Sequence, residues 1–332
     1  MALSSYVIAR ARELQESSDD IEAMLRLSRV FTFACPQDQT ILEQVGSGKL
    51  RHLANGTIYT CERGIWRLLT QERTKYYERF LKEYRSIRRA EGRGSVDADY
   101  YRTLPFADLT GQHREYWHVR ACGFETLIEH VVDPLEARGQ PLKILDIGAG
   151  NGWLSYRLAQ REHHVAAIDL STDDYDGLGS HVHYNIPFVP VQAEFDQLPF
   201  AANQFDLVIF NASFHYSTDY RVTLHEVLRV LQPNCPFVIL DSPVYRRARS
   251  GQMMVREREH YFEEMYGFSS NALPSEHYLT YQRLRTLAEE MELYWDMFTP
   301  EYGLSWSLRP WKARLRGRRE PAKFMAIVGW PR

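Results

Sequence analysis

The sequence predicts an α/β fold in which a small ribbon-and-helix domain precedes a doubly wound, mostly parallel sheet. Three observations support this prediction. Apolar runs of strand length alternate with helical patterns from residue 143 onward, as in proteins built from βαβ units. A glycine-rich turn follows the first of these runs. Between residues 31 and 69, short strand patterns surround an Asn-Gly turn, which is a hairpin signal.

The composition shows no strong charge bias. The 332 residues allow one large domain or two ordinary ones, and 44% apolar residues are enough for a sizeable core. A net charge of −3 gives no general argument for nucleic-acid or membrane binding. Apolar runs are far shorter than the roughly 20 residues of a membrane span, and the N-terminus lacks a signal-peptide layout. The four scattered cysteines suit buried thiols in a reducing compartment, so we expect a cytoplasmic protein.

The N-terminal domain is predicted to span residues 1–95. Residues 1 to about 30 have a helical pattern with an acidic start before its apolar face. Residues 72–89 are predicted to form a charged helix with an apolar inner face. The run Glu91–Ser95 has the composition of a linker. We therefore expect a second domain over residues 96–332.

The ribbon region between these helices contains two fragments that belong together. They are Ala34–Asp38, with its Cys-Pro pair, and Leu50–Leu69, with Gly-x-x-Tyr and Gly-Ile elements. The fragments resemble the small zinc-ribbon module of the Trm112-like kind. Asp38 stands where the second cysteine of that module would stand, and His52 where a third ligand would stand. Because a structural zinc takes four Cys or His ligands, we expect a degenerate, metal-free module and no metal site.

The central motif is the stretch 143–159, KILDIGAGNGWLSYRLA, which has the pattern of a buried strand, a turn and a helix start. Its three glycines remove Cβ atoms and let a ligand approach the backbone closely. A dinucleotide site would have the spacing G-x-G-x-x-G, but the spacing here is G-x-G-x-G, and Asp146 precedes the first glycine. A carboxylate suits a cationic ligand, such as the amino or sulfonium group of S-adenosylmethionine (SAM).

This turn resembles the first motif of class I SAM-dependent methyltransferases, and later motifs extend the resemblance across about 142–241. The resemblance implies a Rossmann-like, seven-stranded, mostly parallel sheet, with SAM as cofactor and S-adenosylhomocysteine (SAH) as product. It also implies cofactor contacts in the turn, from Asp146, Gly148, Ala149, Gly150 and Gly152. Arg120, on a helix predicted over 113–130, either meets the SAM carboxylate or is an ordinary arginine at the edge of the core.

Two further strands are predicted to contribute to the cofactor site. The second strand, 165–170, ends in Asp169 and Leu170, and a carboxylate at that place accepts hydrogen bonds from ribose hydroxyls. NAD enzymes use the same device, so Asp169 alone does not separate the two cofactors. The third strand, 188–191, leads to QAEFDQLPF, which resembles the D-A-x-x-L-P-F motif of the same methyltransferases. The resemblance implies adenine contacts by Glu194 and by the backbone at Phe195.

The fourth predicted strand, 204–211, ends in Asn211. Its carboxyl end lies beside the first strand at the switch point of the sheet, where ligands bind. Asn211 is therefore expected near the reactive methyl group. His215 and Tyr216 follow and are the candidates for a general base. In many such enzymes, however, a histidine at this place only packs against the methionine part of SAM.

After a helix at 224–231 and a fifth strand at 237–240, the stretch 242–275 is long for a plain connection. It is rich in arginine and aromatic residues, so it is either a lid that supplies arginines to an anionic substrate or an exposed helix without substrate contact. A helix at 279–293 and a closing strand at 322–330 complete the chain. The basic run between Lys312 and Arg319 either touches phosphate or is a cationic surface loop.

Together these features predict a SAM-dependent methyltransferase that modifies an O, N or C atom of a small-molecule acceptor. Two alternatives stay open. An RNA (rRNA or tRNA) base methyltransferase is suggested by the zinc-ribbon-like module and the basic run, and it predicts a continuous positive surface leading to Asn211. A non-catalytic SAM-binding partner protein predicts a closed acceptor side.

Overall fold

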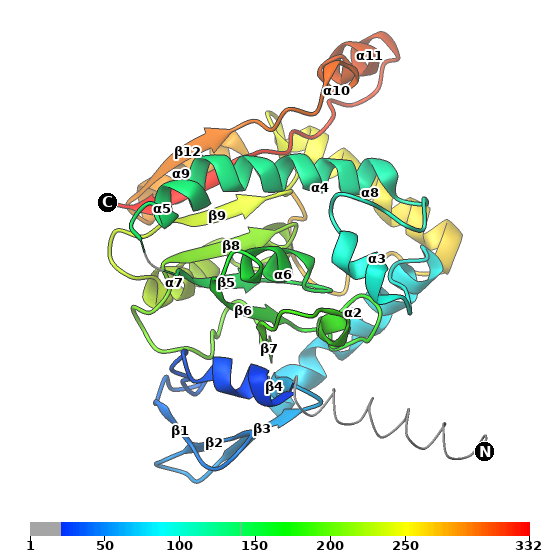
Figure 1. The fold of residues 1–332 in the computed structure, drawn as a ribbon. Coiled ribbons are helices and arrows are strands. Elements are labelled where there is room, and N and C mark those ends of the chain that lie inside the picture. The colour runs from blue at the N-terminus through cyan, green and yellow to red at the C-terminus, as the bar shows by residue number, and fades with distance from the viewer. Residues whose placement is uncertain (1–20, 140) are drawn as a thin grey trace, which may run out of the picture.

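A computed structural model describes residues 21–139 and 141–332, and most of its strands form one large mixed sheet (Figure 1). The strands follow one another in the order β1 (Leu42–Gln44), β2 (Lys49–His52), β3 (Ile58–Glu62), β4 (Ile65–Arg67), β7 (Val189–Gln192), β6 (His164–Asp169), β5 (Lys143–Ile147), β8 (Leu207–Asn211), β9 (Phe237–Leu240), β13 (Ala326–Pro331) and β12 (Leu293–Phe298).

The seven strands from β7 to β12 confirm the doubly wound α/β fold. Strands β7, β6, β5, β8 and β9 pair in parallel, whereas β13 pairs antiparallel with both β9 and β12. The order reverses at β5, which lies between β6 and β8, so the switch point is beside the glycine turn that follows β5. Strand β12 was not predicted, because the sequence analysis continued the preceding helix to residue 293.

The ribbon adds four strands to the seven that were expected. The predicted hairpin is confirmed, since β2 and β3 pair antiparallel on either side of the Asn-Gly turn. Strand β4 then pairs in parallel with β7, with Trp66 opposite Val191. Trp66 is fully buried. The ribbon is thus hydrogen-bonded into the central sheet, and the predicted division at residues 95 and 96 remains a prediction.

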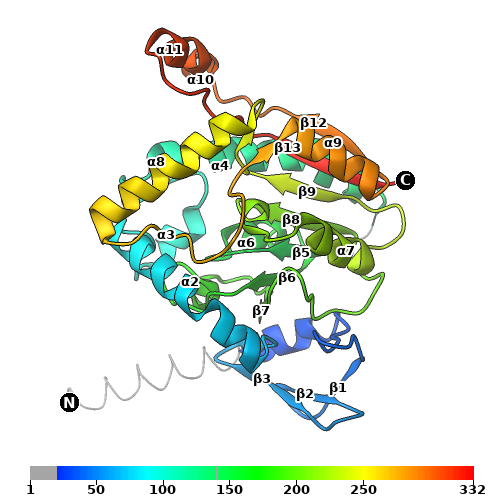
Figure 2. The ribbon, with the colours of Figure 1, turned by 180° about the vertical axis from the view of Figure 1, so that it is seen from behind.

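Two sets of helices cover the two faces of the sheet (Figures 1 and 2). Helices α3 (Ala98–Thr103), α4 (Arg114–Leu127) and α6 (Trp153–Ala159) pack with Ile144 in one apolar core. Helices α7 (Tyr220–Val230) and α9 (Tyr281–Glu290) pack with Leu145 and Ile147 in the other. The alternation along β5 explains this division, because successive side chains of a strand point to opposite faces.

Two long helices lie on the side of the molecule toward which the parallel strands run (Figure 2). They are α2 (Gln71–Ala90), as predicted from the charged pattern, and α8 (Ala248–Tyr266), within the predicted insertion. Short helices α10 (Leu304–Ser307) and α11 (Arg309–Leu315) project from the body. Of the predicted N-terminal helix, residues 21–28 are helical and residues 1–20 lie outside the described part. No helix in the described ranges is long and apolar enough to cross a membrane.

Candidate active site

The glycine turn after β5 allows the backbone to pass close to two neighbouring side chains. Gly148 has φ +72°, and a Cβ there would lie 2.4 Å from the Cβ of Ser213. Gly152 has φ +80°, and a Cβ there would lie 2.5 Å from the ring of Phe188. Both positions therefore require glycine. Gly152 serves packing, since it lines no cavity described below, whereas Gly148 lines two.

Asp146 lies beneath the turn and is fully buried. Its Oδ2 accepts a hydrogen bond from the Ser155 hydroxyl at 2.7 Å, and its Oδ1 has no partner among the described residues. Burial raises the pKa of this carboxyl to about 7, although the Ser155 hydrogen bonds act in the opposite direction. Asp146 lines neither cavity, so its predicted contact with the cofactor remains a prediction.

Asp169 ends strand β6 beside the turn. Its carboxylate accepts hydrogen bonds from the backbone N–H of Gly150 at 2.9 Å and of Ser171 at 2.7 Å. The enclosed position raises the pKa of Asp169 to about 6, against the effect of these two hydrogen bonds. The backbone therefore orients the carboxylate, which faces the first cavity.

The first cavity, of about 740 Å³, lies between the carboxyl ends of the strands and helix α2. Six residues predicted for the cofactor or for catalysis line it, namely Gly148, Asp169, Leu170, Glu194, Phe195 and Tyr216. The opposite wall consists of α2 side chains, which are Tyr77, Phe80, Leu81 and Tyr84. The sequence pattern predicted an inner face made of Tyr76, Phe80, Leu81 and Tyr84. The structure replaces Tyr76, which is exposed, by Tyr77, and it shows that this face covers a site.

Glu194 is held in place by two side chains of α2. Arg73 donates from Nε to Oε1 at 2.7 Å and from Nη2 to Oε2 at 2.5 Å, and the Tyr77 hydroxyl donates to Oε2 at 2.7 Å. Glu194 is 2% exposed. A paired carboxylate with two oxygens can still accept a further hydrogen bond. The predicted adenine ligand is thus oriented by the N-terminal part of the chain.

A second and larger cavity, of about 1,660 Å³, adjoins the first. It is lined by the predicted residues Ala149, Gly150, Asn211, Arg120, His215 and Tyr216. The two cavities share five wall residues, which are Tyr84, Gly148, Asp176, Ala212 and Tyr216. Wall residues that the sequence analysis did not assign come from α8 (Met254, Arg258) and from the C-terminal segment (Trp306, Arg309, Arg319).

Arg120 is one member of a charged cluster in the second cavity. It donates to Asp241 at 3.0 Å and to the hydroxyl of Tyr116. Burial alone would raise the pKa of Tyr116, but the positive charges of Arg120, Arg88 and Arg93 outweigh it and lower the pKa to about 8. Arg120 is therefore an ion-paired residue at the methionine end of the predicted site.

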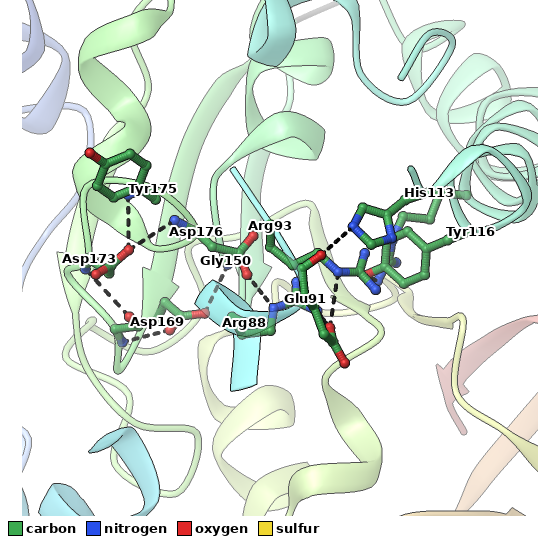
Figure 3. A network of polar contacts seen from close by, with 12 residues as sticks. Arg88, Glu91, Arg93, His113, Tyr116, Gly150, Asp169, Asp173, Tyr175 and Asp176 are labelled. Atoms are coloured by element: carbon green, nitrogen blue, oxygen red, sulfur yellow. Dashed lines mark hydrogen bonds and ion pairs between the residues drawn. The ribbon is translucent and has the colours of Figure 1, made fainter. Parts of the chain in front are cut away.

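Asp176 connects the loop after β6 with helix α2 (Figure 3). Its carboxylate accepts a hydrogen bond from Arg88, and its own N–H donates to Asp173 at 3.2 Å. The same view shows Asp169 bonded to Gly150. Asp176 is buried and borders both cavities.

His215 is buried in the wall of the second cavity, and its Nδ1 lies 3.2 Å from the Ser242 hydroxyl. Burial, with positive charge from His277, Arg258 and Arg120, lowers its pKa to about 3. The imidazole is therefore neutral near pH 7 and is a weak base. Tyr216 packs beside it with a ring-centroid distance of 4.6 Å. The structure thus brings the two predicted base candidates together.

The zinc-ribbon-like module has three potential metal donors. Cys35, Asp38 and His52 place one ligand atom each within 4.8 Å of one another. His52 Nε2 lies 2.9 Å from Asp38, and its Nδ1 accepts the N–H of Ala54 at 3.2 Å. Both ring nitrogens are thus engaged in hydrogen bonds. Three donors with this pairing do not fit the closed four-ligand site of a structural zinc.

The central part of the chain is similar to known proteins. Residues 145–239 match the model of a family described as "Methyltransferase domain". A malonyl-[acyl-carrier protein] O-methyltransferase of Hahella chejuensis is 35% identical over 101 residues, which cover 30% of this chain and 36% of that protein. The mitochondrial arginine-hydroxylase NDUFAF5 of Rattus norvegicus is 34% identical over 102 residues, covering 31% and 29%.

The chain thus spans about a third of the length of the curated relatives it matches. A solved structure described as a putative sarcosine dimethylglycine methyltransferase from Galdieria sulphuraria covers 75% of this chain and 98% of its own, with a TM-score of 0.46 and 16% identity.

Proposed function

We propose, on the premise that this chain contains a class I SAM-dependent methyltransferase domain, that it transfers the methyl group of SAM to an O, N or C atom of a small-molecule acceptor. The observation that carries the proposal is the junction of the two cavities at Gly148, Ala212 and Tyr216. A cofactor whose nucleoside occupies the first cavity would extend past this junction, and its reactive group would face the second.

The nucleoside would be held by groups that the chain has already oriented. Asp169 would accept hydrogen bonds from the ribose hydroxyls, and Glu194 would accept one from the adenine amine. The missing Cβ of Gly148 lets Ser213, another residue of the cavity wall, lie close against the glycine turn. The aromatic and aliphatic face of α2 would cover the base and exclude water.

In the second cavity, bound SAM would supply a methyl group on a positively charged sulfur, which is electrophilic without further activation. The work of this chain is then to align an acceptor with that methyl group and keep water away. Asn211 and the backbone at Ala212 border the place where the two would meet. The neutral imidazole of His215 can accept a hydrogen bond from an acceptor, but its low pKa makes it a weak base.

An oxygen acceptor is the most consistent choice. Several relatives are described as O-methyltransferases, and an acceptor that is already anionic needs no strong base. Because these relatives are described as malonyl-[acyl-carrier protein] O-methyltransferases, an activity screen of this chain should include malonyl-acyl-carrier protein as an acceptor.

The test is calorimetric titration of the protein with SAH and, separately, with NADH. We expect micromolar binding of SAH alone, and a loss of about 100-fold or more in Asp169→Ala. Asp169→Asn, which keeps the shape but not the charge, should bind with intermediate affinity. Binding of NADH alone would overturn the proposal. Because one relative is described as a hydroxylase, the activity assay should follow transfer of labelled methyl from SAM.

RNA methylation is a second candidate, and one observation favours it. The segment 309–319 contains six cationic side chains and no acid, and its Arg309 and Arg319 line the second cavity. This function predicts RNA binding whose affinity falls steeply with salt, and filter binding of tRNA and rRNA fragments between 50 mM and about 200 mM salt tests it. The non-catalytic alternative predicts a closed acceptor side, which the size of the second cavity does not favour.

A further inference from the structure

Five arginines line the second cavity, and they differ in one respect. Three of them form ion pairs with carboxylates of the chain, in the pairs Arg88 with Asp176, Arg120 with Asp241, and Arg319 with Glu257. Arg258 and Arg309 make no hydrogen bond or ion pair with any of the described residues. Within the described residues, the cavity therefore has two cationic groups that no carboxylate pairs with directly.

Arg258 is the clearer case. It lies on α8, and both its Nε and its Nη2 are buried without a partner among the described residues. The ring centroid of Phe262 lies 6.0 Å from the guanidinium carbon of Arg258. A buried N–H group without an acceptor is costly, and the cost is larger when the group is charged. A ligand that supplies an acceptor would remove this cost.

Arg309 completes the pair from another part of the chain. It begins α11 and lies over the ring of Trp306, at 3.8 Å from the ring centroid. Its Nη1 is also buried without a partner among the described residues. Two unpaired guanidinium groups on separate elements thus border one cavity, and stacking on Trp306 holds one of them in a fixed orientation.

No carboxylate of the described residues forms an ion pair with either arginine, and only Glu115 acts on Arg309 through its charge at longer range. His215 and His277 border the same cavity, and burial together with the nearby Arg258 lowers the pKa of each to about 3, so both are neutral. The acids of the cavity wall are Glu115, Asp176 and Asp241. Two of them are already paired with Arg88 and Arg120. The wall therefore has more positive than negative groups.

We propose that the acceptor bears a carboxylate or phosphate group and that Arg258 binds this group, with Arg309 as its second ligand. The inference rests on the proposed function, because it concerns the acceptor half of the same site. Both arginines can hold two oxygens of such an anion at once. The remaining wall includes Tyr245, Met254 and Phe324, which suits an apolar body attached to the anionic group.

The cofactor brings a carboxylate of its own, so the two anions must be separated. Arg88 and Arg120 border the cavity together with the glycine turn, and they are the basic groups expected near the methionine end. Arg258 lies instead on α8 and acts electrostatically on His215 and His277. If Arg258 binds the acceptor, its removal should weaken acceptor binding much more than SAH binding.

The experiment is a titration of the SAH-saturated, full-length protein with octanoate, octyl phosphate and the neutral octanamide. Arg258→Gln is the test variant. Arg256→Gln is its matched control, because Arg256 is exposed on the same helix and borders neither cavity. We expect at least one anionic probe to bind about 10-fold more tightly than octanamide, and Arg258→Gln to remove that difference. Arg256→Gln should bind like the wild type.

The two anionic probes distinguish a carboxylate from a phosphate acceptor. Equal binding of octanamide and both anions, or equal loss in Arg258→Gln and Arg256→Gln, would overturn the inference. A 10-fold loss of SAH affinity in Arg258→Gln would overturn it too, since the arginine would then serve the cofactor. Preference for an RNA oligonucleotide over both probes would replace the small acceptor by RNA. Failure of the wild type to bind SAH would instead contradict the proposed function.

Discussion

The site has a nucleoside half, which is the first cavity, and an acceptor half, which is the second cavity. The two halves differ in whether their charged side chains have hydrogen-bond partners within the chain. In the nucleoside half, the Asp169 carboxylate accepts hydrogen bonds from two backbone N–H groups, and Glu194 accepts hydrogen bonds from Arg73 and Tyr77. In the acceptor half, Arg258 and Arg309 have buried nitrogen atoms without partners among the described residues. A half that binds an invariant nucleoside can be complete before the ligand arrives, whereas a charge left without a partner indicates what the ligand must bring.

The largest effect on SAH binding is expected from adding a Cβ to the glycine turn in the wall of the nucleoside half. In Gly148→Ala, the new Cβ would lie 2.4 Å from Ser213 Cβ in a backbone conformation with φ +72°. We expect the affinity for SAH to fall by about 100-fold, equivalent to roughly 3 kcal/mol. Calorimetry with SAH measures the loss, and thermal unfolding measures the accompanying strain, which should be about 1–2 kcal/mol.

Gly139→Ala is the control for this substitution. Gly139 also has a positive φ, +79°, but a Cβ there meets nothing within 4 Å. It therefore has the backbone strain without the collision. Equal loss of SAH affinity in both variants would show that backbone strain alone, and not the collision with Ser213 at the cavity wall, causes the effect.

A smaller effect is expected from changing Glu194, the side chain predicted to bind the adenine. In Glu194→Gln, Arg73 loses its counter-charge, and the side chain keeps only one of the two oxygens that can accept a hydrogen bond. SAH affinity should fall about 10-fold, and the free energy of unfolding by about 1–3 kcal/mol, as for hydrogen bonds to charged groups. Chemical denaturation with and without SAH separates the two effects.

Arg79→Gln provides the comparison on the same helix. Arg79 pairs with Glu83 at 2.8 Å, but its side chain is 70% exposed. A surface pair of this kind contributes about 0.3–0.5 kcal/mol. If Arg79→Gln weakened SAH binding as much as Glu194→Gln, helix α2 rather than the Glu194 pair would be responsible.

The buried carboxyl beneath the junction should make stability depend on pH. The pKa of Asp146 is raised to about 7 by burial, against about 4 in an unfolded chain. Between these values the folded chain keeps a proton that the unfolded chain has lost, so the free energy of unfolding falls as pH rises from about 4 to about 7. Asp169, with a raised pKa of about 6, acts in the same direction.

Thermal unfolding of the ligand-free protein at pH 5 and pH 7.5 tests this. The Tm of the wild type should fall over this range by several degrees more than the Tm of Asp146→Asn, since about 1 kcal/mol shifts Tm by roughly 2–4 °C. Asp99→Asn, at an exposed position, should keep the wild-type pH dependence. An unchanged slope in Asp146→Asn would mean that Asp146 is ionised when folded.

The smallest effect is expected outside both halves, in the ribbon. Because His52 is engaged by Asp38 and by backbone N–H groups, treatment with a chelator should leave both Tm and SAH binding unchanged. Metal analysis of the purified protein accompanies this measurement. Stoichiometric zinc, with a fall in Tm on chelation, would show that the ribbon supports the site through a metal.

The sequence predicted the parts of the molecule that depend on local patterns. The strand–turn–helix of residues 143–159 carries its own signals, and eleven of the thirteen predicted site residues line one of the two cavities. The exceptions, Asp146 and Gly152, lie in the motif but border neither cavity, and their contacts with the cofactor remain predictions. The unpredicted parts depend on distant contacts. Strand β12 exists because β13 pairs with it, and Arg73 reaches Glu194 across 121 positions of the chain.

The acceptor half could not be predicted for the same reason. The arginine-rich composition of 242–275 was visible, but nothing in the local pattern distinguishes Arg258 from the exposed Arg256. Only the packing of α8 over the strand ends decides which arginine borders the cavity. Which arginines can bind a ligand thus depends on which face of α8 packs toward the cavity, and composition alone does not specify that face.

The pairing of β4 with β7 also protects the protein from self-association. Without it, β7 would present a row of free N–H and C=O groups, which is a template for another chain. Val189 and Val191 on that strand are fully buried now and would become exposed. At the other end of the ribbon, the outermost strand β1 is only three residues long and carries the exposed Glu43 and Gln44. A chain shortened to residues 96–332 should therefore aggregate, and the ribbon acts as a cap on the sheet.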